Sequence, residues 1–438
     1  MFFQKEIETM SRKEIEELQL QRLKKMVDYC YNNVPFYHER LKKAGVTGDK
    51  IKTLSDLQYI PVTTKDDIRD NYPTGLLATP MKNVVRVHAS SGTTGKPTIG
   101  MYTRNDLENW GNQVARVAVA GGATEDDIFQ ISFGYGLFTG ALGLHYGLEK
   151  IGATVIPASS GNTEKQLMLF RDLGVTGLVA TPSYALYLGE MVKESPYPRD
   201  AYKLRLALLG SEGCTAEMRT EIEKNLGVFV SDNYGMTELT GPGVSGECQY
   251  RCGLHFAEDA YLPEIIDPDT MEHKAEGEVG ELVVTTLLRE AMPVLRYRTK
   301  DITRLNYEPC RCGRTGVRME KVMGRTDDMM IIKGVNVFPS QIESVLVGTE
   351  HVGPHYQLVV RRKNFMDNLE VKVELVSGEL LESFGGLETL QKQIHDRLKS
   401  VLGLETKVTL VEPKSLERFQ GKAKRVLDLR NESEGGTK

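Results

Sequence analysis

Residues 88–100 read HASSGTTGKPTIG and follow the largely apolar run NVVRV at 83–87. Within SSGTTGK (90–96), two serines, two glycines, two threonines and one lysine stand together. A loop of this composition can wrap a phosphate group with backbone N–H groups and hydroxyls. It differs from the G-x-x-x-x-G-K-[ST] loop of kinases and GTPases, because Gly92 and Gly95 are too close and Pro97 follows Lys96. We therefore expect either a phosphate loop of another kind or a surface turn.

The chain around this loop alternates strand-like and helix-like segments. Short apolar runs occur at 84–89, 127–133, 154–158, 177–181, 204–210 and 228–234, with polar, helix-like stretches between them. This alternation favours an α/β fold with ligands at the loops after the strands. Before these runs, residues 1–75 are expected to be mainly helical, because Ser11 and Glu14 form a capping-box pattern ahead of an apolar helical repeat.

A different pattern begins after Arg325. Strand-like alternation at 356–362, 369–376 and 407–413, with helix-like segments at 339–347 and 388–402, is typical of a small α+β domain. We therefore expect a large domain at 1–326, a small domain at 327–438 and a disordered tail at 431–438.

Composition argues against several classes of function. The 438 residues carry a net charge of −5 without a basic cluster, so a nucleic-acid partner is not expected. The segment 131–148 has no fixed charge, but its five glycines and marginal length favour a buried segment beside a pocket over a membrane span. Residues 1–18 carry charges early and lack an apolar core, so we expect no secretory signal and a cytoplasmic location.

Four further motifs carry groups suited to a nucleotide. DNYGMTE (232–238) offers a ring for a base at Tyr234, a hydroxyl at Thr237 and a magnesium ligand at Glu238. RYRTKD (296–301) ends in Asp301, which can accept hydrogen bonds from ribose hydroxyls. GRTDDMMIIKGVNVFPSQIE (324–343) and QGKAKRV (420–426) complete the set. Each residue alone has an ordinary explanation, such as a solvated lysine or a helix cap, so the joint order carries the argument.

These motifs and SSGTTGKPT, in this order, resemble the adenylate-forming superfamily of acyl-CoA synthetases, luciferases and peptide-synthetase adenylation domains. The stretches FGYGLFTGALGLHYGLE (133–149), YGMTELTGPGVSGEC (234–248) and GLHFAEDAYLPEIIDP (253–268) look more like the phenylacetate–CoA ligase family. The resemblance implies an AMP-forming acid–CoA ligase with a large layered N-terminal domain and a small mobile C-terminal domain. In that reaction a carboxylate attacks the α-phosphorus of ATP, and coenzyme A then displaces AMP from the acyl-adenylate.

The resemblance also implies roles for single residues. Lys96 and the loop 90–95 would hold the β- and γ-phosphates, and Glu238 would bind Mg²⁺ beside Thr237. Lys422 would bridge the carboxylate and the α-phosphate, with Lys424 as the alternative. The implied nucleotide contacts are Ser90, Ser91, Gly92, Thr93, Thr94, Gly95, Lys96, Ser211, Glu212, Gly213, Asp232, Asn233, Tyr234, Gly235, Met236, Asp301 and Arg325.

Within that set, the resemblance places Tyr234 on adenine and Asp301 on the ribose, while Arg325 reaches the ribose or a phosphate. The turn GSEG (210–213) stands where the family has a glycine-alanine-glutamate turn beside adenine. Ser211 and Cys214 depart from the family pattern at this turn.

The family also rotates its small domain between the two half-reactions. Lys422 would serve adenylate formation, and Asp327 would be the hinge. For thioester formation, a loop on the coenzyme A side would replace Lys422; it consists of Lys333, Gly334, Val335 and Asn336.

The acid is expected to bind against the segment 131–148, with Tyr135 and Phe138 as candidate walls. Glycines in this segment leave room for a flat ring, so an aromatic acid such as phenylacetate is favoured. Hydroxyphenylacetate, indoleacetate and benzoate-like acids stay open as alternatives.

The six cysteines include two close pairs. ECQYRCGLH (247–255) and PCRCGRTG (309–316) provide Cys248, Cys252, His255, Cys310 and Cys312. Thiolates and an imidazole suit a structural tetrahedral Zn²⁺, which takes four ligands. We expect the four to be Cys248, His255, Cys310 and Cys312, with Cys252 as the spare. Reduced buried cysteines without a metal are the alternative.

Other functions stay open. An enzyme of the same superfamily could pass the acyl group to a carrier protein, and a zinc-stabilised nucleotide-binding protein would release no pyrophosphate. A phosphate-loop kinase is disfavoured by Pro97. The expected partners are ATP, coenzyme A and an aromatic carboxylic acid, and the resemblance implies a homodimer.

Overall fold

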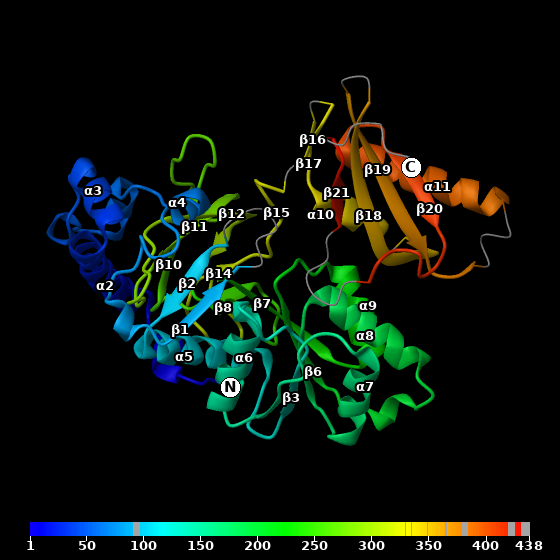
Figure 1. Ribbon diagram of the computed structural model, residues 1–438, viewed down its shortest axis with the longest axis horizontal. Helices are drawn as coiled ribbons and strands as arrows, with labels where there is room; N and C mark the ends of the chain where they lie inside the picture. The colour runs from blue at the N-terminus through cyan, green and yellow to red at the C-terminus, as the bar shows by residue number, and fades with distance from the viewer. Residues whose placement is uncertain are drawn as a thin grey trace.

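The computed structural model describes residues 1–90, 97–328, 330–333, 335–347, 349–363, 366–378, 384–418 and 425–430. A nine-stranded mixed sheet lies at its centre, in the order β13-β14-β9-β8-β7-β6-β5-β3-β4 (Figure 1). Neighbouring strands are parallel from β7 to β4 and antiparallel from β7 to β13. The strands are β3 (Ile128–Ile131), β4 (Thr154–Ile156), β5 (Gly177–Ala180), β6 (Leu206–Gly210), β7 (Phe229–Met236), β8 (Gly241–Glu247), β9 (Leu254–Phe256), β13 (Leu305–Asn306) and β14 (Arg318–Met319).

Alternate residues of β6 pack on opposite faces of this sheet. Leu206 and Leu208 lie in one core with α5 and α6, whereas Ala207 and Leu209 lie in another with α7, α8 and α9. Because helices cover both faces, the strand is a continuous apolar run in the sequence. The helices are α5 (Arg104–Gly121), α6 (Thr139–Lys150), α7 (Thr163–Asp172), α8 (Pro182–Glu194) and α9 (Ala216–Leu226).

The parallel strands bring several loops to one edge of the sheet. β3, β5, β6 and β7 run in the same direction, so their carboxyl ends meet at that edge. The segments 132–138, 181–183, 211–215 and 237–240 begin there. The motifs in which the sequence predicts ligand contacts, GSEG and DNYGMTE, therefore end at the same edge.

The predicted strand at 84–89 lies outside this sheet. β1 (Arg86–Ala89) pairs antiparallel with β2 (Ile99–Tyr102), and Ala89 is opposite Ile99. The link at 90–98 is short enough for a hairpin, whereas a parallel crossover needs a dozen or more residues. The other five predicted runs are strands of the nine-stranded sheet.

A four-stranded antiparallel sheet shares a core with the N-terminal helices. Its strands are β10 (Tyr261–Ile266), β11 (Gly280–Thr286), β12 (Tyr297–Thr303) and β15 (Gly324–Arg325). α2 (Arg12–Asn33) begins at the predicted capping box, where Ser11 and Glu14 each accept the other's backbone N–H. The other short elements are α1 (Lys5–Glu8), α3 (Pro35–Ala44), η1 (Gly48–Lys50), η2 (Leu54–Tyr59), α4 (Lys65–Asp70), η3 (Met81–Asn83) and η4 (Arg199–Ala201).

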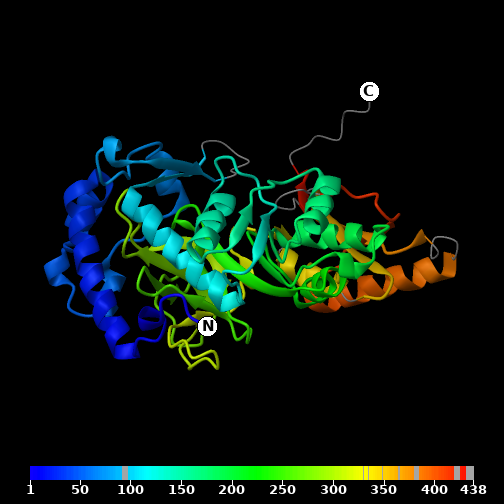
Figure 2. The same cartoon turned by 90° about the horizontal axis from the view of Figure 1, so that it is seen from below.

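The C-terminal residues form a separate body with its own apolar core. β18 (Val352–Lys363) and β19 (Met366–Leu375) pair antiparallel, and β20 (Lys407–Val411) and β21 (Val426–Asp428) join them as parallel edge strands. The body also contains α10 (Pro339–Leu346), α11 (Phe384–Leu402) and the hairpin β16 (Met330–Ile332) to β17 (Val335–Val337). Figures 1 and 2 show this body beside α8 and α9. The predicted α/β fold with a large N-terminal part and a small C-terminal part is confirmed.

The apolar segment 131–148 does not form a single long helix. It contributes the end of β3, a loop and most of α6. No helix in the described part of the chain is long and apolar enough to cross a membrane. The tail at 431–438, for which the sequence predicts disorder, lies outside the described residues.

Candidate active site

The stem of the glycine-rich loop is held beside the segment that follows β3. The Ser90 N–H donates to the Thr98 carbonyl at 2.9 Å, and the Thr98 N–H donates to Ser90 Oγ at 3.1 Å. The Ala89 N–H and His88 Nδ1 lie 2.8 and 3.0 Å from the Leu137 carbonyl oxygen. The loop itself, with the predicted phosphate contacts Ser91, Gly92, Thr93, Thr94, Gly95 and Lys96, lies outside the described residues.

Strand β7 carries the DNYGMTE motif to the same edge of the sheet. Gly235 is required at the start of the β7–β8 pairing, since a Cβ there would lie 2.0 Å from the Gly241 carbonyl oxygen. Thr237 is buried, and its Oγ1 lies 3.4 Å from Thr139 Oγ1 at the start of α6. Glu238 is partly exposed and makes no hydrogen bond or ion pair to the residues that the structure describes. Such a carboxylate is suited to binding a cation.

Three predicted nucleotide contacts form one hydrogen-bonded cluster. Asp301 is 3% exposed and accepts the Tyr234 hydroxyl and Arg325 Nη1, each at 2.6 Å. Strand pairing produces this contact, because Asp301 is opposite Arg325 in the β12–β15 ladder. Arg325 Nε also donates to the Asp327 carboxylate at 2.9 Å. The cluster therefore connects β7 to the segment that leads into the C-terminal body.

The electrostatics of this cluster follow from its burial. Burial raises the pKa of the Asp301 carboxyl, and the Arg325 guanidinium opposes that shift. Burial and the Asp301 carboxylate raise the pKa of the Tyr234 phenol well above its usual range. Tyr234 is therefore a neutral hydrogen-bond donor to Asp301, and the carboxylate keeps lone pairs for a ligand.

The turn after β6 packs closely against β7. Gly210 is opposite Asn233, and a Cβ on Gly210 would lie 2.4 Å from the Asn233 carbonyl oxygen. Ser211 adopts the left-handed region with φ of 74°. The next residue, Glu212, accepts a hydrogen bond from the Ser183 hydroxyl at the start of α8, and Gly213 follows it. The predicted adenine turn and the DNYGMTE strand are thus neighbours.

Asp232, the first residue of that motif, belongs to a network of charges. Its backbone N–H donates to the Glu247 carboxylate at 3.0 Å, and Arg219 binds the same carboxylate at 2.7 Å. Burial and the Glu247 charge raise the pKa of Asp232 to about 6. Asp232 therefore holds a proton more readily than a solvent-exposed aspartate, next to the predicted adenine turn.

The predicted acid-binding segment places Tyr135 and Phe138 on the loop between β3 and α6. Tyr135 Oη lies 3.0 Å from His145 Nδ1, and His145 Nε2 lies 3.0 Å from Glu149 Oε1. The rings of Phe133 and Phe138 have centroids 6.2 Å apart. The chain from Glu149 through His145 orients the Tyr135 hydroxyl. Neither His145 nor Glu149 is a sequence-predicted site residue, although their spacing of four on a helix was an available signal.

Cys248, His255, Cys310 and Cys312 converge, and their ligand atoms all lie within 4.8 Å of one another. The Sγ atoms of Cys248 and Cys310 are 3.7 Å apart, and Cys312 Sγ lies 3.5 Å from His255 Nε2. Hydrogen bonds from Cys248 and His255 lower the pKa of the Cys312 thiol. Cys252 is not part of this group; it is exposed, and its thiol donates to the Tyr250 carbonyl.

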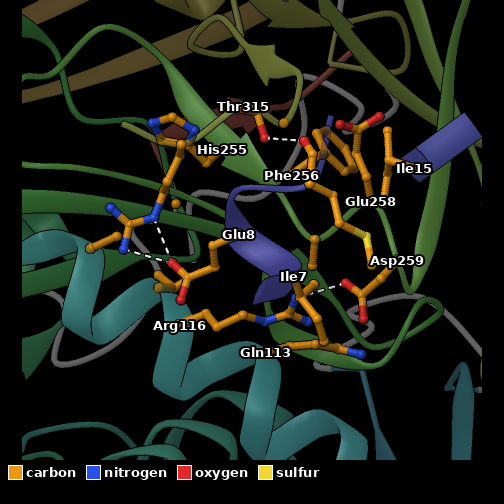
Figure 3. Close-up of a pocket in the computed structure, with 17 residues that line it drawn as sticks. Ile7, Glu8, Ile15, Gln113, Arg116, His255, Phe256, Glu258, Asp259 and Thr315 are labelled. Atoms are coloured by element: carbon orange, nitrogen blue, oxygen red, sulfur yellow. Dashed lines mark hydrogen bonds and ion pairs between the residues drawn. The ribbon is translucent and has the colours of Figure 1, made fainter. Parts of the chain in front are cut away.

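The loop that carries Cys310 and Cys312 also holds the N-terminal segment. Arg314 binds the Glu8 carboxylate at 2.7 Å, and its guanidinium lies over the Phe2 ring at 4.8 Å. Figure 3 shows the neighbouring cavity, with Glu8 and His255 in its wall. No predicted nucleotide contact in the described part of the chain lines this cavity.

Comparison with protein families identifies both bodies. The family described as AMP-binding enzyme matches residues 18–287, and the AMP-binding enzyme C-terminal domain matches residues 334–430. The phenylacetate–coenzyme A ligase of Thermus thermophilus is 48% identical over 98% of this chain and all of that protein. The protein of that name from Escherichia coli is 48% identical over 97% of both chains.

The chain belongs to the phenylacetate–coenzyme A ligase family.

The predicted family and chemistry are therefore confirmed. As a member of the phenylacetate–coenzyme A ligase family, the protein is an AMP-forming acid–CoA ligase that works through an acyl-adenylate. The near-complete coverage of both curated relatives means that both bodies and all five motifs lie within the shared sequence.

A solved structure of another ligase shares the whole fold at 28% identity. The TM-score is 0.90 against 2-hydroxyisobutyryl-CoA ligase in the postadenylation state with 2-HIB-AMP, over 97% of this chain and 91% of that chain. The TM-score is 0.73 against the same enzyme in the thioesterification state with 2-HIB-AMP and coenzyme A, over 98% of this chain and 93% of that chain. The two bodies of this phenylacetate–coenzyme A ligase family member are therefore arranged much as in the first of these states.

The predicted coenzyme A loop belongs to the C-terminal body. Lys333 is exposed at the turn between β16 and β17, and Val335 begins β17. In Figure 1 this hairpin is at the upper edge of the C-terminal body, away from β6 and β7. Asn336 lies on β17, whereas Gly334, Lys422 and Lys424 are outside the described residues.

Sequence reasoning also missed Ser183. This residue follows β5 and its hydroxyl bonds Glu212, so it lies at the same edge as the predicted contacts. Its place at the start of the helix that follows a buried strand was the available signal.

Proposed function

We propose that this ligase activates a phenylacetate-like aromatic acid, first to the acyl-adenylate and then to the coenzyme A thioester. The observation that carries the substrate class is the 48% identity, over nearly the full chain, to two phenylacetate–coenzyme A ligases. The loop with Phe133, Tyr135 and Phe138 supports it, because aromatic walls beside glycine backbone suit a flat ring.

The proposed nucleotide site follows from the charges at the strand edge. Asp301, oriented by Tyr234 and Arg325, would accept the ribose hydroxyls. Glu238 fits Mg²⁺, since its carboxylate has no protein partner among the described residues. The metal would reduce the charge of the phosphates when bound. Lys96 would hold the β- and γ-phosphates beside the Ser90 stem.

The chemistry needs positive charge at the α-phosphorus, because a carboxylate and a triphosphate repel each other. An acid oxygen attacks that phosphorus, the bond to the bridging oxygen of the β-phosphate breaks, and pyrophosphate leaves. The coenzyme A sulfur then attacks the acyl carbon, and AMP leaves with the bonding electrons. We assign Lys422 to the first step and the loop 333–336 to the second.

We propose that the small domain begins at 327 and rotates about Asp327 between these steps. The TM-scores of 0.90 and 0.73 support an adenylate-forming arrangement here. Burial lowers the pKa of Arg425, but Tyr356, Glu343 and the large-domain Glu212 raise it overall. Lys422 is three residues from Arg425 in the sequence, so we propose that Lys422 acts near the 210–213 turn that carries Glu212.

A pyrophosphate-release screen over carboxylic acids, with and without coenzyme A, tests the proposed substrate. We expect phenylacetate to be preferred over benzoate by roughly tenfold or more in kcat/KM, since one methylene in an apolar pocket discriminates by that order. Coenzyme A should release AMP and yield the thioester. Release of AMP only with a carrier protein would contradict the proposal, as would the absence of pyrophosphate with every acid.

We also propose a structural Zn²⁺ on Cys248, His255, Cys310 and Cys312. Tetrahedral zinc with Zn–S of about 2.3 Å and Zn–N of about 2.05 Å separates two sulfurs by about 3.8 Å and a sulfur from a nitrogen by about 3.6 Å. The corresponding distances here are 3.7 and 3.5 Å, so the residues fit the ion. When bound, it would cross-link the β8–β9 region to the 310–315 loop.

Loss of zinc should release the N-terminal segment. Arg314 and Thr315 form hydrogen bonds with Glu8, so a disordered 310–315 loop would no longer hold this segment. Trypsin should then cleave within residues 1–25 about tenfold faster, which corresponds to a decrease of ~1.4 kcal/mol in the free energy of local opening. Cys310→Ser and chelator treatment should each have this effect, and Cys252→Ser should not. Less than half an equivalent of zinc in protein purified without chelator would contradict the site.

The homodimer is proposed from the family resemblance. A cytoplasmic location is proposed from the use of ATP and coenzyme A.

A further inference from the structure

The C-terminal end of α8 carries charges that its own helix disfavours. Glu190 and Glu194 are four residues apart, so they lie on one face in the last turns of the helix. Like charges at this spacing repel each other, and carboxylates at a helix C-terminus oppose the helix dipole. A stabilising partner for this pair must therefore come from elsewhere.

The partners come from the C-terminal body. His355 Nε2, on β18, lies 3.1 Å from Glu190 Oε1, and Lys414 Nζ lies 3.0 Å from Glu194 Oε1. The His355 side chain is only 15% exposed, so its contact is shielded from solvent. Within the described part of the chain, every ion pair of these two carboxylates crosses between the bodies.

Arg418 also lies on the side of the C-terminal body that faces this helix end. Arg418 is bound to the Glu374 carboxylate at 2.8 Å within the C-terminal body. Burial lowers the pKa of the Arg418 guanidinium, whereas Glu374 and, across the interface, Glu190 raise it. The docking surface of the C-terminal body is therefore positive, and the end of α8 is negative.

We propose that Glu190 and Glu194 on α8, with His355 and Lys414, form a latch that holds the C-terminal body in the orientation for acyl-adenylate formation. The four are positioning residues, because none of them lies in the cluster around Asp301. The latch rests on the proposed rotation of the small domain, and it identifies the residues that stabilise one of the two orientations. Rotation of one body relative to the other must break the Glu190–His355 and Glu194–Lys414 contacts before the coenzyme A step.

The expected strength of the latch follows from how far its side chains are exposed to solvent. A partly exposed ion pair shifts an equilibrium by about 1.5- to fivefold, so two pairs together shift the population of the docked orientation by about two- to 25-fold. Removing the latch should therefore slow one half-reaction without abolishing it.

Charge reversal with a swap tests the latch. Glu194→Lys and Lys414→Glu should each lower the rate of adenylate formation by about three- to tenfold, since each also creates a like-charge contact. Thioester formation from preformed acyl-adenylate and coenzyme A should be unchanged or faster. The double swap should restore adenylate formation to within about twofold. His355→Ala should produce the same split between half-reactions.

Lys407→Glu is the matched control. Lys407 is 70% exposed, as Lys414 is, but it pairs with Glu370 inside the C-terminal body. This variant should change neither half-reaction by more than about twofold. Equal loss in both half-reactions, no effect of the reversals, or a swap that fails to restore the rate would overturn the latch.

Small-angle X-ray scattering separates failure of the latch from failure of the proposed function. Single reversals should move the scattering curve away from the docked arrangement, and the swap should return it, whether or not an acid is turned over. Wild-type protein without pyrophosphate release would contradict the proposed function alone. Identical scattering of all variants would overturn the latch alone.

Discussion

Lys422→Ala is expected to reduce adenylate formation by roughly 10²- to 10³-fold, the scale on which one preorganised donor to a developing anion acts. The carboxylate and the α-phosphate would then meet without the cation that offsets their repulsion. Transfer of the acyl group from preformed acyl-adenylate to coenzyme A should be retained, because we assign that step to the loop 333–336. Pyrophosphate exchange and thioester formation measure the two half-reactions separately.

Lys424→Ala is the matched comparison, since it removes a lysine of the same QGKAKRV motif. It should leave adenylate formation within about threefold of wild type if Lys422 is the bridging cation. A large loss with Lys424→Ala and none with Lys422→Ala would transfer the role to Lys424. Equal losses in both half-reactions for Lys422→Ala would count against the rotation.

Asp301→Asn is expected to lower kcat/KM for ATP by about 10²-fold or more, because hydrogen bonds to a charged acceptor contribute about 1.5–3 kcal/mol each. The Asp301 carboxylate accepts hydrogen bonds from the Tyr234 hydroxyl and from the Arg325 guanidinium. An amide offers them one oxygen, so it cannot serve both donors and the ribose hydroxyls. The KM for coenzyme A should change little.

The protein should stay folded in this variant, because Arg325 keeps the Asp327 carboxylate at 2.9 Å and lies partly in solvent. We expect a loss of about 1–2 kcal/mol in unfolding free energy, from the one orphaned donor. Asp328→Asn is the control, since its carboxylate is 58% exposed and 3.6 Å from the same guanidinium. An ATP dependence of Asp301→Asn that matches wild type would refute the ribose assignment.

Much of the fold could be read from local patterns. The run 204–210 indicates a strand covered on both faces, and Leu206 and Ala207 indeed lie in opposite cores. Ser11 and Glu14 mark the start of α2 because a capping box involves only neighbouring residues. The run 84–89 was correctly expected to be a strand, but its pairing depended on the short link that follows it.

The site was predicted less completely. Asp301, Tyr234 and Arg325 were predicted as nucleotide contacts because their motifs occur in a distinctive order, and the structure brings the three together. His145 and Ser183 were not, because a single histidine or serine has no such context. For the cysteine group, the four residues expected from the sequence, Cys248, His255, Cys310 and Cys312, do converge, and Cys252 lies outside the group.

The sequence by itself determined much of the strand and helix order and the family, since these depend on residue types at fixed spacing along the chain. The tertiary structure alone decided that Asp301 is opposite Arg325, that Tyr135 is tied to Glu149 through His145, and that the end of α8 meets the C-terminal body. These contacts depend on sheet register and on how the two bodies dock. Both are set by packing between residues far apart in the chain, for which the sequence shows no local signal.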